Sequence, residues 1–151
     1  MSEIAWETEC SVESRSSLEF AWAYMSNVAN WDDPPATFEL EGPFTSGSRG
    51  ITRTPGQEPR PWRLAEVRPR ESYTIETEFD GASMSFEWRF ARASGGTRLT
   101  QHLILKGQKA AAYRPQVEAA FASNLEAGMR RISSAIEQAE ARSGRLDAPI
   151  A

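Results

Sequence analysis

Polar side chains that could transfer protons lie among apolar residues in the middle of the chain. Six of them fall in segments where apolar and polar residues alternate, so strand geometry could turn them toward an apolar interior. Apolar surroundings raise the pKa of a carboxyl group and could make it a proton donor or acceptor near neutral pH. No two of these residues have a spacing that fixes them as a pair. The six candidates are Arg49, Arg53, Glu66, Tyr73, Thr77 and Gln101.

Other reactive residues have simpler interpretations. His102 directly follows Gln101, so strand alternation sends His102 outward if Gln101 points inward. Asp32 and Asp33 precede two prolines and are typical of a solvated turn. Cys10 lies on the apolar face of a predicted strand, and no basic neighbour in the sequence would stabilise its thiolate. One Cys and one His cannot form a zinc site of the usual ligand set, and we expect no metal and no other cofactor.

Alternating residues and turn residues indicate the strands that would position these side chains. The dipeptides Gly42-Pro43, Pro55-Gly56 and Asp80-Gly81 and the run Ser94-Gly95-Gly96 are typical of tight turns. Strands that are joined by such short turns pair antiparallel. The sequence predicts seven strands, at residues 4–12, 37–41, 49–54, 62–67, 73–79, 84–91 and 99–105.

Two short helices are predicted between the first and second strands. Ser16 and Glu19 have the spacing of a capping box, and a short helical pattern follows to about Asn27. A second helical turn carries Val28 and Trp31 and stops at two prolines, which cannot continue a helix.

An apolar stripe after the last strand predicts one long helix over residues 113–141. At about 1.5 Å per residue, this helix is long enough to cross a small sheet. We expect one domain over residues 1–142 and a flexible C-terminal tail over residues 143–151. The stripe consists of Val117, Phe121, Leu125, Met129, Ile132 and Ile136.

Length and composition narrow the class of protein. A chain of 151 residues with 40% hydrophobic residues suits one globular domain. The net charge of −4 argues against nucleic-acid binding, which normally needs a basic patch. The first ten residues lack the basic and apolar regions of a secretory leader, and the sequence has no run of eighteen apolar residues, so we expect a cytoplasmic protein without stable membrane insertion. A monomer or a homodimer fits the sequence equally well.

Several short motifs recur at characteristic points between the predicted elements. They lie in the first predicted helix, after the turn that follows it, in the turn after the second strand, at the end of the fourth strand, and at both ends of the seventh strand. They are Trp22, Trp31, Gly42-Pro43-Phe44, Gly47, Gly50, the Ala-Glu-Val-Arg-Pro of residues 65–69, the Gly-Thr-Arg-Leu-Thr of residues 96–100, and Gly107.

Together with the element order, these motifs resemble the polyketide cyclase/dehydrase type of the START and birch-pollen-allergen superfamily. The resemblance covers nearly the whole chain and implies an α+β helix-grip fold. In that fold a seven-stranded antiparallel sheet curves around a long C-terminal helix, with two short helices between strands 1 and 2. In close relatives the positions of Trp88 and Gln101 are often His, so their replacement here favours binding over acid/base catalysis.

The resemblance further implies an elongated cavity between the sheet and the helix. The residues on the inward faces are mostly apolar and aromatic, as in small-molecule pockets, although such side chains could also simply fill a core. Gly128 lies on the inner helix stripe, where glycine costs about 1 kcal/mol relative to alanine. An empty volume, or a strand that approaches closely, would explain it. The expected lining is Trp6, Phe38, Leu40, Trp62, Tyr73, Ile75, Phe79, Met84, Phe86, Trp88, Gln101, Leu103, Phe121, Leu125, Gly128 and Met129.

Two classes of function follow from this cavity. The first is binding of a hydrophobic or aromatic small molecule, such as a lipid or a polyketide-like metabolite, with Gln101 as a hydrogen-bonding anchor. The alternative is a cofactor-independent polyketide cyclase or dehydratase that folds a reactive chain and uses polar side chains for proton transfer. A module that docks on a chaperone would need an exposed apolar patch.

Overall fold

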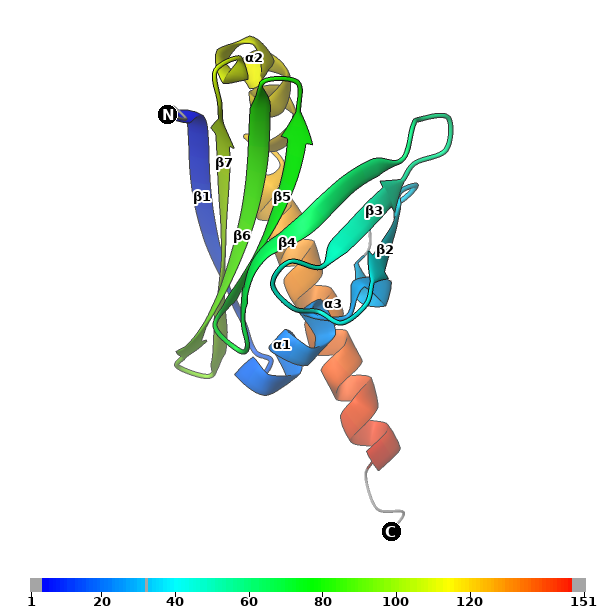
Figure 1. Ribbon diagram of the computed structural model, residues 1–151. Coiled ribbons are helices and arrows are strands. Elements are labelled where there is room, and N and C mark those ends of the chain that lie inside the picture. Colours follow the sequence, from blue (N-terminus) through cyan, green and yellow to red (C-terminus); the bar gives the residue numbers. More distant parts are fainter. Residues whose placement is uncertain (1–3, 32, 148–151) are drawn as a thin grey trace.

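One antiparallel sheet of seven strands forms the scaffold (Figure 1). The computed structural model describes residues 4–31 and 33–147. The strand order β1-β7-β6-β5-β4-β3-β2 confirms the predicted sheet, because β2 to β7 lie side by side in sequence order and β1 pairs with β7. The fold is the predicted α+β helix grip. The strands are β1 (Ile4–Ser14), β2 (Thr37–Glu41), β3 (Arg49–Arg53), β4 (Arg60–Arg68), β5 (Ser72–Phe79), β6 (Ala82–Ala93) and β7 (Gly96–Lys106).

Two short helices lie between β1 and β2, as predicted: α1 (Leu18–Met25) and the 3-10 helix η1 (Val28–Asn30). The predicted cap of α1 is wrong by one residue. Ser17, and not Ser16, caps the helix, because its Oγ accepts a hydrogen bond from the Phe20 backbone N–H at 3.2 Å. Ser16 is instead buried at the entry to the helix.

The C-terminal helical segment differs from the prediction of one continuous helix over residues 113–141. It consists of α2 (Ala110–Phe121) and α3 (Leu125–Asp147). The Asn124 carbonyl accepts the Gly128 N–H at 2.9 Å, which makes Asn124 the residue that opens α3. Asparagine favours such positions because its side chain competes with helical backbone hydrogen bonds. The apolar stripe continues across the interruption, so periodicity alone did not reveal it.

The end of α3 also lies beyond the predicted domain boundary at residue 142. Helical structure continues to Asp147. The last part of the predicted flexible tail, residues 148–151, lies outside the described residues. No helix in the described ranges is long and apolar enough to cross a membrane.

Helix α3 packs mainly against the β1 edge of the sheet. Its neighbours are β1 and α1, while α2 lies against β1 and β7. In Figure 1, α3 passes behind the sheet, and β2, β3 and β4 extend to the other side of it. The C-terminal helices therefore pack mainly on the β1 side of the concave face, while Trp22 of α1 and Trp31 after η1 contact β4 and β5.

Glu137 anchors α3 to the corner between β1 and α1. Its carboxylate accepts the Arg15 backbone N–H at 2.8 Å and the Arg15 guanidinium and Ser14 hydroxyl at 3.3 Å each. The side chain of Glu137 is only 21% exposed. The Arg15 backbone N–H, supported by the Arg15 side chain and Ser14, holds the pKa of the Glu137 carboxyl below its usual value.

This anchor predicts a specific pH dependence of stability. A lowered folded-state pKa stabilises the fold above the unfolded pKa of about 4.3, and this contribution is lost as the pH falls through the folded pKa. Glu137→Gln should therefore lower the free energy of unfolding by about 1–3 kcal/mol at pH 7. Urea denaturation should show the difference from wild type narrowing on acidification below about pH 4. A difference that stays constant would contradict the anchor.

Gly50 on β3 lies directly under the indole ring of Trp62 on β4. A Cβ at position 50 would overlap three ring carbons of Trp62, whose side chain is buried. Gly50→Ala should therefore destabilise the fold by about 1–3 kcal/mol in urea denaturation, the usual cost of overpacking. Gly128→Ala is the control, because a Cβ there meets no atom within 4 Å. That variant should be as stable as wild type or more stable, by up to about 1 kcal/mol.

Candidate ligand-binding cavity

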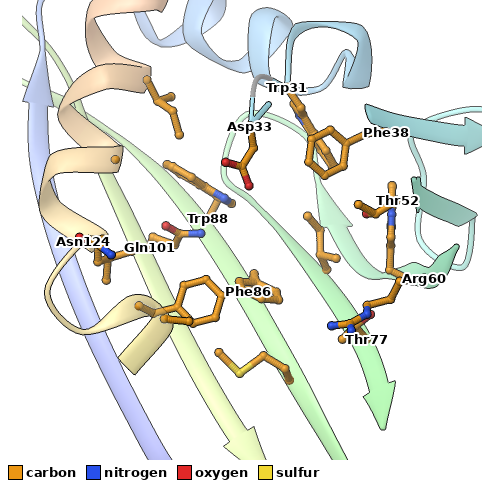
Figure 2. A pocket seen from close by; sticks show the side chains of 18 of the residues that line it. Trp31, Asp33, Phe38, Thr52, Arg60, Thr77, Phe86, Trp88, Gln101 and Asn124 are labelled. Atoms are coloured by element: carbon orange, nitrogen blue, oxygen red, sulfur yellow. The ribbon is translucent and has the colours of Figure 1, made fainter. Parts of the chain in front are cut away.

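A cavity of about 1020 Å³ lies in the part of the concave face that the C-terminal helices do not fill. Strands β2 to β7 form one wall, and α2, α3 and the segment from α1 to residue 33 form the other. Figure 2 shows lining side chains that converge on this space from both walls. Most of the deep lining is apolar or aromatic, which is typical of small-molecule pockets.

The structure brings most of the predicted lining residues together around this cavity. Their role in binding a ligand stays a prediction. The predicted residues that line the cavity are Phe38, Trp62, Tyr73, Ile75, Phe79, Met84, Phe86, Trp88, Gln101, Phe121, Leu125, Gly128 and Met129.

Three predicted lining residues lie in packed clusters instead. Trp6 and Leu103 belong to the apolar cluster below α2, because α2 covers the strand pair β1–β7 at that end. Leu40 on the edge strand β2 packs against the main core. All three face the concave side, as alternation predicts, but another element covers them.

Aromatic side chains shape the wall near η1. The Trp31 ring lies 5.4 Å from the Trp62 ring and stacks 6.1 Å from the Tyr73 ring, measured between centroids. The Trp31 indole N–H donates to the Met25 carbonyl at 2.7 Å, which fixes the orientation of the ring. These contacts give the cavity a rigid aromatic side.

Trp88 and Gln101 lie opposite each other on β6 and β7, and both line the cavity, as predicted. Figure 2 shows the two side chains side by side at the centre of the view. Within the described part of the chain, the Gln101 side-chain amide has no hydrogen-bond partner. It is therefore a polar group that a bound molecule could satisfy.

Tyr73 and Thr77 are two further proton-transfer candidates that line the cavity. Tyr73 is 1% exposed, and burial raises the pKa of its phenol far above the ordinary value. The phenol therefore stays protonated at neutral pH and can donate a hydrogen bond but cannot accept a proton as phenolate. The Thr77 hydroxyl donates to the Pro61 carbonyl at 3.0 Å.

The remaining proton-transfer candidates do not reach the cavity. Arg49 and Arg53 are exposed on β3, and Arg53 pairs with Glu39 at 2.5 Å. Glu66 pairs with Arg68 at 3.1 Å and is 52% exposed. A register shift between Leu64 and Glu66 interrupts the alternation of β4 at this point.

His102 lies on the outer face of the sheet, as predicted. Its Nε2 is 2.9 Å from a Glu7 carboxylate oxygen, and its Nδ1 is 3.7 Å from Glu87. Cys10 is half-buried, and burial is the main cause of a raised pKa of its thiol, so it behaves as a small apolar residue. Asp33 is exposed in a turn at the cavity, as predicted, and Asp32 lies outside the described residues.

Gly128 faces open space. An added Cβ would meet no atom within 4 Å, and the residue lines the cavity. The interpretation that a strand approaches closely at this point is therefore wrong, and the interpretation that an empty volume lies beside Gly128 stays a prediction as far as a ligand is concerned.

Several polar lining residues were not predicted from the sequence. Arg60 was missed because the fourth strand was predicted to start at residue 62, although alternation continued back from Trp62 would have placed Arg60 on the same face. Asn124 lines the cavity because the helix breaks there, and Arg131 reaches it from α3. Among the residues with described positions, no three His, Cys, Asp or Glu side chains gather into a possible metal site.

Comparisons with known proteins identify relatives of the fold. A family model described as polyketide cyclase / dehydrase and lipid transport matches residues 5–137. None of the curated proteins matches the chain by sequence.

Solved structures of similar fold include proteins of different origins. Their sequence identities to this chain are low, so these similarities show the fold alone. Protein NE0264 from Nitrosomonas europaea has a TM-score of 0.69 at 12% identity, over 89% of this chain and 96% of that protein. Norcoclaurine synthase from Thalictrum flavum, in complex with dopamine and hydroxybenzaldehyde, has a TM-score of 0.67 at 11% identity, over 94% and 88%. The di-domain ARO/CYC StfQ from the steffimycin biosynthetic pathway has a TM-score of 0.68 at 13% identity, over 91% of this chain and 52% of StfQ.

The buried position of Tyr73 predicts that its phenol does not ionise while the protein is folded. In an alkaline titration, the tyrosinate absorbance of wild type and Tyr73→Phe should coincide as long as both proteins remain folded. After unfolding in urea at the same pH, the two should differ by one tyrosine. A difference that develops in the folded protein would show that the Tyr73 hydroxyl is open to water.

Proposed function

The chain belongs to the polyketide cyclase/dehydrase and lipid transport family, and we propose that it binds a hydrophobic or aromatic small molecule in the cavity. The observation that carries the proposal is the cavity of about 1020 Å³ with its apolar and aromatic lining. This volume is at the upper end of ordinary ligand pockets, about 300–1,000 Å³. A ligand with several rings or a long chain would fit it.

Affinity would come from apolar area that the ligand and the cavity remove from water, at about 25 cal/mol per Å². Rigid rings lose little entropy when a ligand binds, and they offer faces and edges to an aromatic ligand. Gln101 supplies a donor and an acceptor at the centre of the wall, beside Trp88. The Gln101 amide would orient a carbonyl or hydroxyl group of the ligand without contributing charge.

A cyclase or dehydratase is the alternative, and StfQ and norcoclaurine synthase show that enzymes use this fold. One observation favours it: the Asp33 side chain points into the cavity in Figure 2, where it could accept a proton from a bound substrate. Binding is the better supported function, because the other polar groups near Trp88 are a neutral amide and a protonated phenol. If Asp33→Asn abolished turnover of a polyketide-like substrate without weakening its binding, catalysis would be favoured.

A chaperone-docking module has less support. Ile4, at 55%, is the one large apolar side chain that is exposed within the described ranges. A single exposed residue does not form a docking patch.

Two measurements test the proposed binding function directly. N-phenyl-1-naphthylamine is an uncharged aromatic probe whose fluorescence rises in apolar surroundings, and it should bind the purified protein saturably at one site. Native mass spectrometry of gently purified protein should also show whether a small molecule stays bound. Absence of saturable probe binding by a folded, ligand-free protein would contradict the proposal.

The two glycines of α3 provide a matched pair of variants. Gly128 lines the cavity, and Gly144 lies on the same helix outside it, with no atom within 4 Å of an added Cβ at either position. Gly128→Leu should occupy part of the cavity and weaken N-phenyl-1-naphthylamine binding by roughly tenfold, a change of about 1.4 kcal/mol. Gly144→Leu should bind like wild type. Circular dichroism should show both variants folded, and equal binding by both would place the probe elsewhere.

A further inference from the structure

We infer that the ligand of this cavity is an amphipathic organic acid whose carboxylate is bound by Arg60, with the apolar body extending along the aromatic wall. The inference rests on the proposed binding function and adds to it the chemical class of the ligand. It is carried by an arginine that lines the cavity and has no carboxylate partner among the residues that the structure describes.

Arg60 lies at the first position of β4, on the same face as Trp62. Its guanidinium carbon is 5.5 Å from the centroid of the Phe79 ring on β5. At this distance the cation interacts favourably with the ring, which holds the guanidinium in place without neutralising its charge. Figure 2 shows the Arg60 side chain turned into the cavity, which Thr77 also lines.

Two neighbouring arginines, one on each of β3 and β4, are paired with carboxylates. Arg53 on β3 pairs with Glu39 at 2.5 Å, and Arg63 on β4 pairs with Glu76 at 2.6 Å. Both pairs join adjacent strands. Arg60 lies three residues from Arg63 but contacts an aromatic ring instead of an acid. Its charge is therefore available to a group that enters the cavity.

Two acidic residues also line the cavity, and neither neutralises Arg60. Asp33 follows η1 on the opposite wall, and Glu58 lies in the loop before β4. No ion pair links either carboxylate to Arg60 within the described part of the chain. Arg131 on α3 is a second cation of the lining, on the other wall from Arg60.

An arginine suits a carboxylate better than other cations do. The planar guanidinium can donate two parallel hydrogen bonds to both carboxylate oxygens, and it stays charged at every physiological pH. The residues beyond Arg60 on the inner face of β5 and β6 include Ile75, Met84 and Phe86, which offer apolar contacts to the rest of the molecule. A charged head beside an apolar wall matches an acid with a hydrophobic body.

A matched pair of probes tests this inference: 11-(dansylamino)undecanoic acid and its methyl ester, which differ only in the carboxylate. Wild-type protein should bind the acid roughly tenfold more tightly than the ester, the effect of one hydrogen-bonded charged group. Arg60→Gln should remove this preference by weakening the acid alone. Arg60→Lys should keep part of it, because the charge remains and the bidentate geometry is lost. Added salt should reduce the preference in wild type.

Arg63→Gln is the control variant, because it removes an arginine of the same strand whose side chain pairs with Glu76. It should leave the acid-to-ester ratio unchanged, and thermal melting should show that all variants are folded. If wild type binds the two probes equally, the ligand class is wrong while the proposed binding function stands. If neither probe binds, the binding function itself fails. A preference that survives in Arg60→Gln, or that disappears in Arg131→Gln instead, would overturn the assignment to Arg60.

Discussion

The attachment of α3 to the corner between β1 and α1 determines where this protein has a core and where it has a cavity. The Glu137 carboxylate accepts a hydrogen bond from the Arg15 backbone N–H, and the Glu140 carboxylate accepts hydrogen bonds from the Ser17 backbone N–H and hydroxyl. These bonds fix the helix at the β1 side of the sheet. Apolar side chains of α3 fill the space above that side. The same attachment holds the helix away from β3, β4 and β5, and the space in front of those strands becomes the cavity.

Strand alternation and turn residues predicted the sheet well, because both act over a few residues. The hairpins around Gly81 and Gly95 have positive φ angles of 77° and 84°, which glycine adopts easily, and the paired positions of Trp88 and Gln101 follow from the second hairpin. The break before Leu125 was not predicted. An apolar stripe reports which face of a helix is buried, and it is unaffected when the backbone turns at Ser123 and Asn124 and then resumes the same phase.

The candidate site was predicted only as far as the face of each strand. Alternation gives the side of the sheet on which Trp6, Leu40 and Leu103 lie, but whether a helix covers them depends on contacts between distant parts of the chain. Whether a charged residue forms an ion pair is harder to predict from the sequence than the face on which it lies. Whether Arg60 is paired depends on which acidic side chains the neighbouring strand presents, and here β5 presents Phe79 in place of an acid.

Residues 122–124 join α2, which lines one end of the cavity, to α3, which is attached to β1 and α1. Phe121, Asn124 and Leu125 line the cavity at this joint, yet no hydrogen bond of the sheet passes through residues 122–124. An insertion or deletion at the joint would redirect α2 and resize the cavity without disturbing any strand register. The size of the cavity can thus change through one short linker, while the residues that set the strand register stay the same.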